Sequence, residues 1–394
     1  MIPISEAISI IKRETHSLET EIVDLSAVCG RILAEDIFAD SDLPPFDRSQ
    51  MDGYAVKSKD LQIVPTKLKI VGESRAGKGW HHELNHGEAI RIMTGAPVPS
   101  GADSVQKVEV TKETGDFVEI FEPPHSGQFI NPQASEISKG EKVFQKGEII
   151  NPMMIATIAS FGYAKVKVAK RPTVAIVTTG NEIVRVEETP KQDEIRDSNT
   201  PALRVLAEKY ASIETLPIAE DNLESLKRQI ADCKTDILVL TGGVSMGVYD
   251  FTKTALIELG AQIFIEKVQL KPGKPFVFAK LGKQLIFGLP GNPVSAMVTF
   301  SLFVRTVILE MQSALQSELK SGFAMVCKEL KGAKERDSYL PAGLSSNEKG
   351  QLIAMPLRFF GSSDFVSFSR CDALVFVPKG KTLAAESVVQ IKFL

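Results

Sequence analysis

Glycine-rich segments follow runs of apolar residues at several points in the middle of the chain. One is Thr241-Gly-Gly-Val-Ser-Met-Gly247, and another is Gly288-Leu-Pro-Gly-Asn-Pro-Val-Ser295. Glycine lets backbone N–H groups approach a phosphate or another oxyanion closely, and a helix N-terminus after Asn292 would favour the same ligand. The glycines could also do no more than form tight turns. Several such loops at one sheet edge favour an oxyanion site.

Three carboxylates occur in or beside these loops. Glu182 follows the first apolar strand, Asp221 precedes a helix, and Asp250 follows the glycine loop at 241–247. A carboxylate raises the free energy of a nearby anionic ligand unless a divalent cation or a hydrogen-bond donor on the ligand intervenes. The pattern therefore indicates Mg²⁺ or a heterocycle rich in N–H groups. Asp221 can equally be the N-cap of the helix that follows it.

Two lysines lie on a short loop bracketed by prolines, Lys271-Pro-Gly-Lys274-Pro275, with Lys267 upstream. At an effective dielectric constant of about 20, one such charge about 4 Å from an oxyanion contributes on the order of 4 kcal/mol. The prolines limit the entropy lost on binding, so the loop is typical of a clamp for a dianion. A solvated turn is the alternative.

Two segments nearer the N-terminus also carry polar residues on loops. Asp52 precedes Gly53 in a polar and aromatic stretch, and Thr94 precedes Gly95 where a strand ends and prolines follow. Each could be a plain turn. The histidine-containing loop at 81–86 is polar, bounded by glycines and without a cysteine partner, so we do not expect a metal site there.

Near-continuous apolar strands dominate residues 172 to about 315. Thr173 to Val177, Asp236 to Leu240 and Gln284 to Phe287 lack alternation, which indicates burial on both faces, and each runs into a glycine loop. These features predict a doubly wound parallel sheet covered by helices. The glycine loops then open onto one crevice at the carboxyl ends of the strands.

Helix start signals separate these strands. They lie at Asn199 before Pro201, at Asp221-Asn222, and at Asn292 before Pro293. Neither the P-loop pattern nor G-x-G-x-x-G occurs, so kinase and Rossmann dehydrogenase readings lack support.

Changes in pattern along the chain predict four domains in an α/β plus β multidomain fold. Residues 1–40 and 140–169 form a discontinuous α+β domain, and the β-rich residues 41–139 are inserted between its two parts. Residues 170–317 form the α/β domain, and short strands over 318–394 form a C-terminal all-β domain. The 394 residues are ample for several cores.

Charge and composition exclude several classes of protein. A formal net charge of −3 gives no global basic field, so we expect no nucleic-acid partner. The longest apolar stretch stops at Arg305, and the N-terminus has no secretory pattern, so we expect no membrane association. The four cysteines are far apart and are read as reduced thiols, which indicates a cytoplasmic protein.

The motifs taken together resemble the molybdopterin molybdenumtransferase family, MoeA in bacteria and the E domain of gephyrin in animals. The matching segments are Pro45 to Val56, Arg91 to Pro99, Thr241 to Ser245, Lys271 to Pro275 and Gly288 to Ala296. They occur in the family's order across essentially the whole chain. Any one of them is a weak signal, whereas five in order are a strong one.

The resemblance implies a function. Members of this family hydrolyse adenylylated molybdopterin, release AMP and insert molybdate at the dithiolene to form molybdenum cofactor, with Mg²⁺ as the cofactor. They are homodimers, and a molybdopterin adenylyltransferase is a possible partner. The resemblance also makes residues 170–317 the molybdopterin-binding domain.

The resemblance assigns roles residue by residue. Catalytic roles fall on Asp52, Glu182, Asp221, Asp250, Lys267 and Lys271. Metal binding falls on Glu182, Asp221 and Asp250. Molybdate binding falls on Lys271, Lys274, Arg336 and Ser362. Substrate binding falls on Thr94, Gly242, Gly243, Ser245, Pro290, Gly291, Asn292, Pro293 and Ser295.

Two positions depart from the family's pattern. An arginine-rich segment that relatives often carry is Asn131-Pro-Gln-Ala-Ser-Glu136 here, and an arginine often found after the match to Arg336 is Pro341. These departures leave weakened substrate affinity, a shifted substrate preference or a paralogue with altered activity as alternatives. Two other hypotheses stand beside the transferase: a molybdopterin-binding scaffold without turnover, and an enzyme like the molybdopterin adenylyltransferase.

Overall fold

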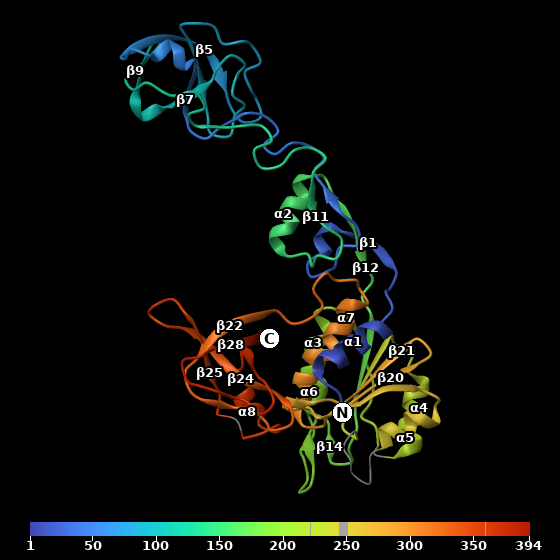
Figure 1. Cartoon of the computed structure of the whole chain (residues 1–394). Coiled ribbons are helices and arrows are strands. Elements are labelled where there is room, and N and C mark those ends of the chain that lie inside the picture. The colour runs from blue at the N-terminus through green and yellow to red at the C-terminus, as the bar shows by residue number, and fades with distance from the viewer. Residues whose placement is uncertain (221, 244–250, 359) are drawn as a thin grey trace. The chain divides into compact units, whose positions relative to one another are not determined.

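A computed structural model describes the chain except for residues 221, 244–250 and 359 (Figure 1). The chain divides into two compact units. The first contains Met1–Glu35, Lys146–Ile155 and Lys165–Leu394, and the second contains Asp36–Gln145 and Ala156–Ala164. The second unit is therefore an insertion into the first along the sequence.

The second unit is built on a six-stranded sheet in the order β7-β4-β6-β5-β9-β8. Its strands are β4 (Gly53–Val56), β5 (Thr66–Ser74), β6 (Glu88–Ile92), β7 (Ser104–Lys107), β8 (Thr111–Thr114) and β9 (Phe117–Ile120). The β-rich character expected of residues 41–139 is present in these strands. Alternating side chains supply two small cores, because Tyr54 and Val56 pack on one face while Ala55 packs on the other.

Short pairs of strands flank this sheet. β2 (Ile37–Phe38) pairs with β11 (Lys142–Phe144), and β3 (Arg48–Ser49) pairs with β10 (Ile130–Asn131). In the first unit, β1 (Thr20–Asp24) pairs with β12 (Lys165–Ala169). Helix α2 covers Pro152–Ser160, and Gly162 follows it at φ 76°, as expected for a glycine past a helix C-terminus.

A six-stranded sheet forms the centre of the first unit, in the order β16-β13-β17-β21-β20-β18. Its strands are β13 (Thr173–Thr178), β16 (Ser212–Thr215), β17 (Ile237–Thr241), β18 (Gln262–Lys267), β20 (Pro275–Leu281) and β21 (Gln284–Leu289). Four strands from β16 to β21 are parallel, as predicted. β20 runs antiparallel to both of its neighbours, β21 and β18, so the sheet is mixed.

Helices cover both faces of this sheet. On one face, Val174 and Ile176 of β13 pack with α1 (Ile4–Glu14), α3 (Asn199–Glu208) and the long helix at 293–310. On the other face, Ala175 and Val177 pack with α4 (Leu223–Asp232) and α5 (Phe251–Glu258). Figure 1 shows α4 and α5 together at one side of the sheet. The strands have no polar alternation because both faces are buried.

The long helix runs over 293–310 as α6 (Pro293–Thr299), a π-helical segment (Phe300–Val304) and α7 (Arg305–Glu310). Among the described residues it is the one helix long and apolar enough to cross a membrane, yet 78% of that window is buried inside the protein. It is therefore a core helix of the α/β domain.

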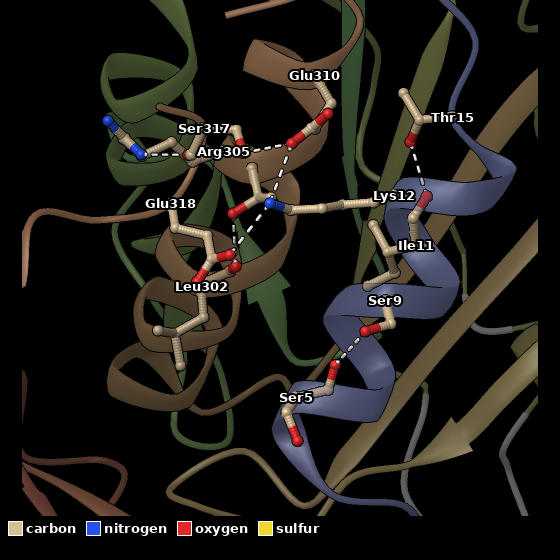
Figure 2. Close-up of polar contacts among 11 residues, drawn as sticks. Ser5, Ser9, Ile11, Lys12, Thr15, Leu302, Arg305, Glu310, Ser317 and Glu318 are labelled. Atoms are coloured by element: carbon tan, nitrogen blue, oxygen red, sulfur yellow. Dashed lines mark hydrogen bonds and ion pairs between the residues drawn. The ribbon is translucent and has the colours of Figure 1, made fainter. Parts of the chain in front are cut away.

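Helix α1 packs against α7 through its apolar face and one cation (Figure 2). The Lys12 ammonium lies 3.1 Å from carboxylate oxygens of both Glu310 and Glu318. Partial burial works against the charge, but the hydrogen bonds to Glu318 and Glu310 prevail and raise the pKa of Lys12. This network fixes the N-terminal helix on the α/β domain.

The C-terminal part of the first unit is a small β-barrel. Its sheet has the order β19-β24-β25-β22-β28-β26, and a further pairing of β24 with β26 closes it. The elements are β19 (Leu270–Lys271), β22 (Ser321–Val326), β23 (Leu330–Lys331), β24 (Asp337–Ser346), β25 (Leu352–Pro356), α8 (Phe365–Phe368), β26 (Ala373–Val377), β27 (Thr382–Leu383) and β28 (Val388–Phe393). The predicted all-β character is confirmed, and β19 comes from the α/β segment.

Candidate active site

A cavity of about 1170 Å³ lies where the parallel strands of the α/β domain end. We call it the glycine-loop pocket. Thr178 and Thr179 after β13, and Thr241 at the end of β17, form part of its wall. Its lining includes seven residues predicted from sequence: Glu182, Gly242, Gly243, Pro290, Gly291, Asn292 and Pro293.

Gly242 occupies a position where no other residue fits. Its φ is +94°, and a Cβ built there would lie 2.5 Å from the Thr179 carbonyl oxygen. L-residues rarely adopt this conformation, and the backbone in contact cannot move aside as a flexible side chain would. Glycine at this position therefore allows both the turn and the close approach of two loops. A tight turn and a role in oxyanion binding are thus compatible at Gly242.

Asn199 ties the two glycine loops together. Its Nδ2 donates to Thr241 Oγ1 at 2.8 Å and to the Gly291 carbonyl oxygen at 2.7 Å, and the side chain is buried. Its Oδ1 is also buried and accepts no hydrogen bond among the described residues. Helix α3 begins at Asn199, as the start signal predicted, but the Asn199 amide does not cap the helix and points instead across the sheet edge.

Asp197 performs the capping that was expected of Asn199. Its Oδ1 accepts hydrogen bonds from the backbone N–H groups of Asn199 and Thr200, both at 3.0 Å. A buried carboxylate at a helix N-terminus is stabilised by these donors and by the helix dipole. Asp197 thus holds the start of α3, and with it Asn199, at the pocket wall.

The predicted carboxylate cluster is described only in part. Glu182 is exposed and lines the glycine-loop pocket, and its carboxylate has no ion-pair partner among the described residues. Asp221, Asp250 and Ser245 lie outside the described residues. The part of the chain that is described holds no group of three metal-binding side chains. A free carboxylate beside Thr and Asn oxygens has the donor chemistry that Mg²⁺ prefers.

A second cavity, of about 760 Å³, adjoins the first. We call it the cation pocket. The four residues predicted to bind molybdate all line it: Lys271, Lys274, Arg336 and Ser362. Lys328 and Arg358 line it as well, and its described lining contains no Asp or Glu. Five cationic side chains around one cavity are suited to an anion.

Backbone pairing fixes the lysine loop against the barrel. β19 pairs in parallel with the start of β24, so Lys271 lies opposite Ser338, two residues beyond Arg336. Gly273, between the two lysines, has a φ of +116°, and a Cβ there would lie 2.6 Å from Thr299 Cγ2. The loop therefore passes tightly over α6, which restricts where the two ammonium groups can lie.

Asn292 lies between the two pockets and lines both. Its Nδ2 donates to Ser362 Oγ at 2.8 Å, and its Oδ1 accepts from Ser363 Oγ at 3.1 Å. Ser362 lines the cation pocket, whereas Ser363 lines the glycine-loop pocket. The predicted cap at Asn292 is present by position, but its side chain bonds the barrel loop instead of the helix.

The barrel loop is held from its other side by Asp364. This carboxylate accepts hydrogen bonds from the backbone N–H groups of Ser367 and Phe360, both at 3.1 Å. These donors, Ser367 first, lower the pKa of Asp364. The loop bearing Ser362 and Ser363 is thus anchored at both ends.

The remaining predicted residues lie in three different places. Ser295 is buried in α6 and lines the cation pocket. Lys267 ends β18 and is absent from the described lining of both pockets. Asp52 and Thr94 belong to the second unit, where Asp52 Oδ1 accepts from the Thr94 N–H at 2.7 Å and from its hydroxyl at 2.9 Å. These bonds lower the pKa of Asp52, the backbone N–H first.

Both departures from the family's pattern have structural counterparts. Glu136, in the segment without arginines, lies 3.8 Å from a guanidinium nitrogen of Arg48. Pro341 lines the cation pocket, where Arg358 lies as well. Four residues at the pockets were missed from sequence: Asp197, Asn199, Lys328 and Arg358. Only Asn199 gave a signal, which was read as a cap.

Two short motifs that match other enzyme classes lie in different surroundings. His82-Glu-Leu-Asn-His86 has zinc-protease spacing but lies in a loop, whereas such a site needs both histidines on one helix face. His86 Nδ1 instead contacts Asp60 Oδ1 at 2.5 Å. Gly243-Val-Ser-Met-Gly247 has the spacing of a serine-hydrolase elbow, but 244–250 lie outside the described residues.

Comparison with known families shows which family this chain belongs to. The MoeA N-terminal region (domains I and II) matches residues 2–162, a probable molybdopterin binding domain matches 175–310, and the MoeA C-terminal region (domain IV) matches 326–394. The chain belongs to the MoeA family. Both pockets therefore lie in the parts of a MoeA protein that match its molybdopterin-binding and C-terminal regions.

Individual relatives agree with this assignment along their whole length. A molybdopterin molybdenumtransferase of Haemophilus influenzae is 35% identical over 377 residues, 94% of this chain and 93% of that protein. One from Staphylococcus aureus is 33% identical over 386 residues, covering 96% and 92%. The solved structure of a MoeA protein from Pyrococcus horikoshii OT3 superposes with a TM-score of 0.83 at 28% identity, over 100% of both chains.

Proposed function

We propose that this MoeA-family protein is a molybdopterin molybdenumtransferase that inserts molybdate into adenylylated molybdopterin and releases AMP. The observation that carries the proposal is the pair of adjoining pockets. The glycine-loop pocket offers backbone and amide groups at the strand ends, and the cation pocket offers five positive side chains without a carboxylate in its described lining. A pterin phosphate suits the first and a tetrahedral dianion suits the second.

The shared wall supports a transfer between two bound substrates. Asn292 lines both pockets and bonds one serine in the lining of each. A pterin dithiolene at this wall would meet an oxyanion held by Lys271 and Lys274. Holding both reactants side by side lowers the entropic part of the barrier. The site residues predicted from sequence, including Asp52 and Thr94 of the second unit, keep their proposed roles.

Glu182 would hold Mg²⁺, with Asp221 and Asp250 as further proposed ligands. Bound there, the cation would supply charge neutralisation for the adenylate phosphates. Glu182→Gln removes one anionic ligand while preserving shape. The variant should need more Mg²⁺ for AMP release, and a Mg²⁺ titration that matches that of the unaltered protein would remove Glu182 from the metal site.

Family membership supports the remaining proposals. We propose a cytoplasmic homodimer, with a molybdopterin adenylyltransferase as the partner that supplies its substrate. We also propose the four-domain division at 1–40 with 140–169, 41–139, 170–317 and 318–394. It is supported by the separate sheets that three of these segments contain.

A direct assay tests the main proposal. Purified protein is incubated with adenylylated molybdopterin, Mg²⁺ and molybdate, and both AMP and active cofactor are measured. The transferase should produce both, and omission of molybdate should prevent formation of active cofactor. Binding of the pterin without AMP release and without active cofactor would favour a scaffold and overturn the enzyme proposal.

A further inference from the structure

Two cations of the cation pocket, Lys328 and Arg358, are not among the residues that the sequence predicted to bind molybdate. Both come from the C-terminal barrel, and both line the cavity together with Lys271 and Lys274. We propose that Lys328 and Arg358 bind the oxyanion substrate from the barrel side of the pocket. This inference rests on the proposed function and adds two substrate-binding residues to it.

The barrel brings these side chains to one edge of its sheet. The last residue of β25, Pro356, pairs with Ala342 in the middle of β24, and the Leu357 N–H extends this pairing by donating to the Pro341 carbonyl oxygen at 3.0 Å. β22 runs parallel to β25, and the Cys327 N–H extends that pairing to the Ala354 carbonyl oxygen at 3.3 Å. Arg358 and Lys328 each follow directly, at the edge where β19 carries Lys271.

No internal partner neutralises these charges. Within the described part of the chain, neither Lys328 nor Arg358 forms an ion pair or a hydrogen bond. The described lining of the cavity also has no carboxylate, so the positive side chains repel one another unless an anion enters. Leucines and prolines at 330, 340, 341, 356 and 357 complete the lining and reduce local screening.

Arg358 is also partly pre-oriented. Its guanidinium lies over the Phe360 ring, 4.8 Å from the ring centroid, and the ring itself is 77% exposed. Stacking on an aromatic face leaves the N–H groups at the guanidinium edge free to donate. Arg336 differs, because its Nη1 already donates to the Leu270 carbonyl oxygen at 3.3 Å. Arg358 is thus the better placed of the two arginines for a new ligand.

Calorimetric titration of the full chain with sodium molybdate tests the inference. The variants are Lys328→Gln, Arg358→Gln and Arg358→Lys, and Lys349→Gln is the matched control because Lys349 is an exposed cation of the same barrel outside the pocket lining. Loss of a charge-assisted hydrogen bond should weaken molybdate binding by about tenfold in each Gln variant. Arg358→Lys should recover part of that loss, and the control should bind as the unaltered protein does.

The outcomes test this inference separately from the proposed transferase activity. Gln variants that bind molybdate as tightly as the unaltered protein would overturn it, as would unaltered protein that binds no molybdate. Release of AMP and formation of cofactor by the unaltered protein, measured in parallel, would leave the transferase standing in either case. Circular dichroism and thermal melting of each variant distinguish lost binding from lost folding.

Discussion

The two adjoining pockets are built by opposite means. The glycine-loop pocket is shaped by backbone: glycines that admit close approach, threonines at strand ends, and one buried amide that joins two loops. The cation pocket is shaped by charged side chains that extend from a barrel edge and from one short loop. The first therefore selects by shape and neutral hydrogen bonds, and the second selects by charge.

This contrast explains how one protein can keep two anionic substrates apart. Backbone donors positioned by glycines suit a large phosphate-bearing ligand and are costly to alter, since the loops contact each other directly. Mobile lysine and arginine side chains suit a small dianion and respond to salt and to single substitutions. Asn292, Pro275 and Pro290 line both pockets, and the Asn292 side chain also bonds the barrel loop through Ser362 and Ser363.

The largest effect is expected when the lysine loop loses its charge. Lys271→Ala with Lys274→Ala should raise the molybdate concentration needed for half-maximal insertion by roughly 100-fold, because two charge-assisted bonds are lost. Pterin affinity should change less than threefold. Lys283→Ala, an exposed lysine of the same domain outside the cation pocket, is the control. Equal loss of pterin and molybdate binding would mean that the pockets do not divide the substrates.

The next effect concerns the glycine-loop pocket alone. Asn199→Ala leaves Thr241 Oγ1 and the Gly291 carbonyl without their shared donor, at a cost of about 1–3 kcal/mol in the free energy of unfolding. Pterin binding should weaken about tenfold while molybdate binding is kept. Asn222→Ala removes the N-cap of α4, whose side chain accepts from the Ser225 N–H, and serves as the control with a similar loss of stability. Equal pterin affinity in both variants would reduce Asn199 to a purely structural residue.

A smaller effect should reach both pockets. Asn292→Ala breaks the bonds to Ser362 and Ser363, so we expect molybdate and pterin binding each to weaken about threefold to tenfold. Molybdate titrations with and without bound pterin measure the coupling between the sites. The variant should show less coupling than the unaltered protein. An effect confined to one ligand would contradict the role of Asn292 as the link.

The smallest effect depends on pH. The pKa of Asp364 is lowered by the N–H groups of Ser367 and Phe360, so its ionised form stabilises the barrel loop above pH 3.8, and this contribution is lost as the pH falls through the lowered pKa. Asp364→Ala should therefore be less stable than the unaltered protein at pH 6 and equal to it well below pH 3.8. Thermal melting across this range measures the difference. A difference that persists at the acid end would contradict the assignment.

Local sequence patterns predicted much of this molecule. The apolar segments at β13, β17 and β21 predicted the sheet. The glycines after them predicted a binding site at the carboxyl ends of its strands, where the glycine-loop pocket lies. The lysine pair at 271 and 274 was recognisable because prolines and glycine fix its loop. These features are short in sequence, and their physical causes lie within a few residues.

The features that were missed depend on contacts between distant segments. β18 and β20 extend the sheet in antiparallel order, which their own residues do not encode. Lys328 and Arg358 meet the lysine loop only because the barrel closes and β19 joins it. Asn199 lies in a sequence pattern typical of a helix start. Its hydrogen bonds to Thr241 and Gly291, 42 and 92 positions away, form only because the strand ends meet in the folded sheet.

Anomalous diffraction at the molybdenum edge, from crystals of the full chain soaked in molybdate, tests most directly whether the cation pocket binds molybdate. We expect a molybdenum peak in the cation pocket. It should lie within hydrogen-bonding distance of one lysine of the loop, Lys271 or Lys274, and of one barrel cation, Arg358 or Lys328. A peak in the glycine-loop pocket with the cation pocket empty, or no peak in either pocket, would contradict this expectation.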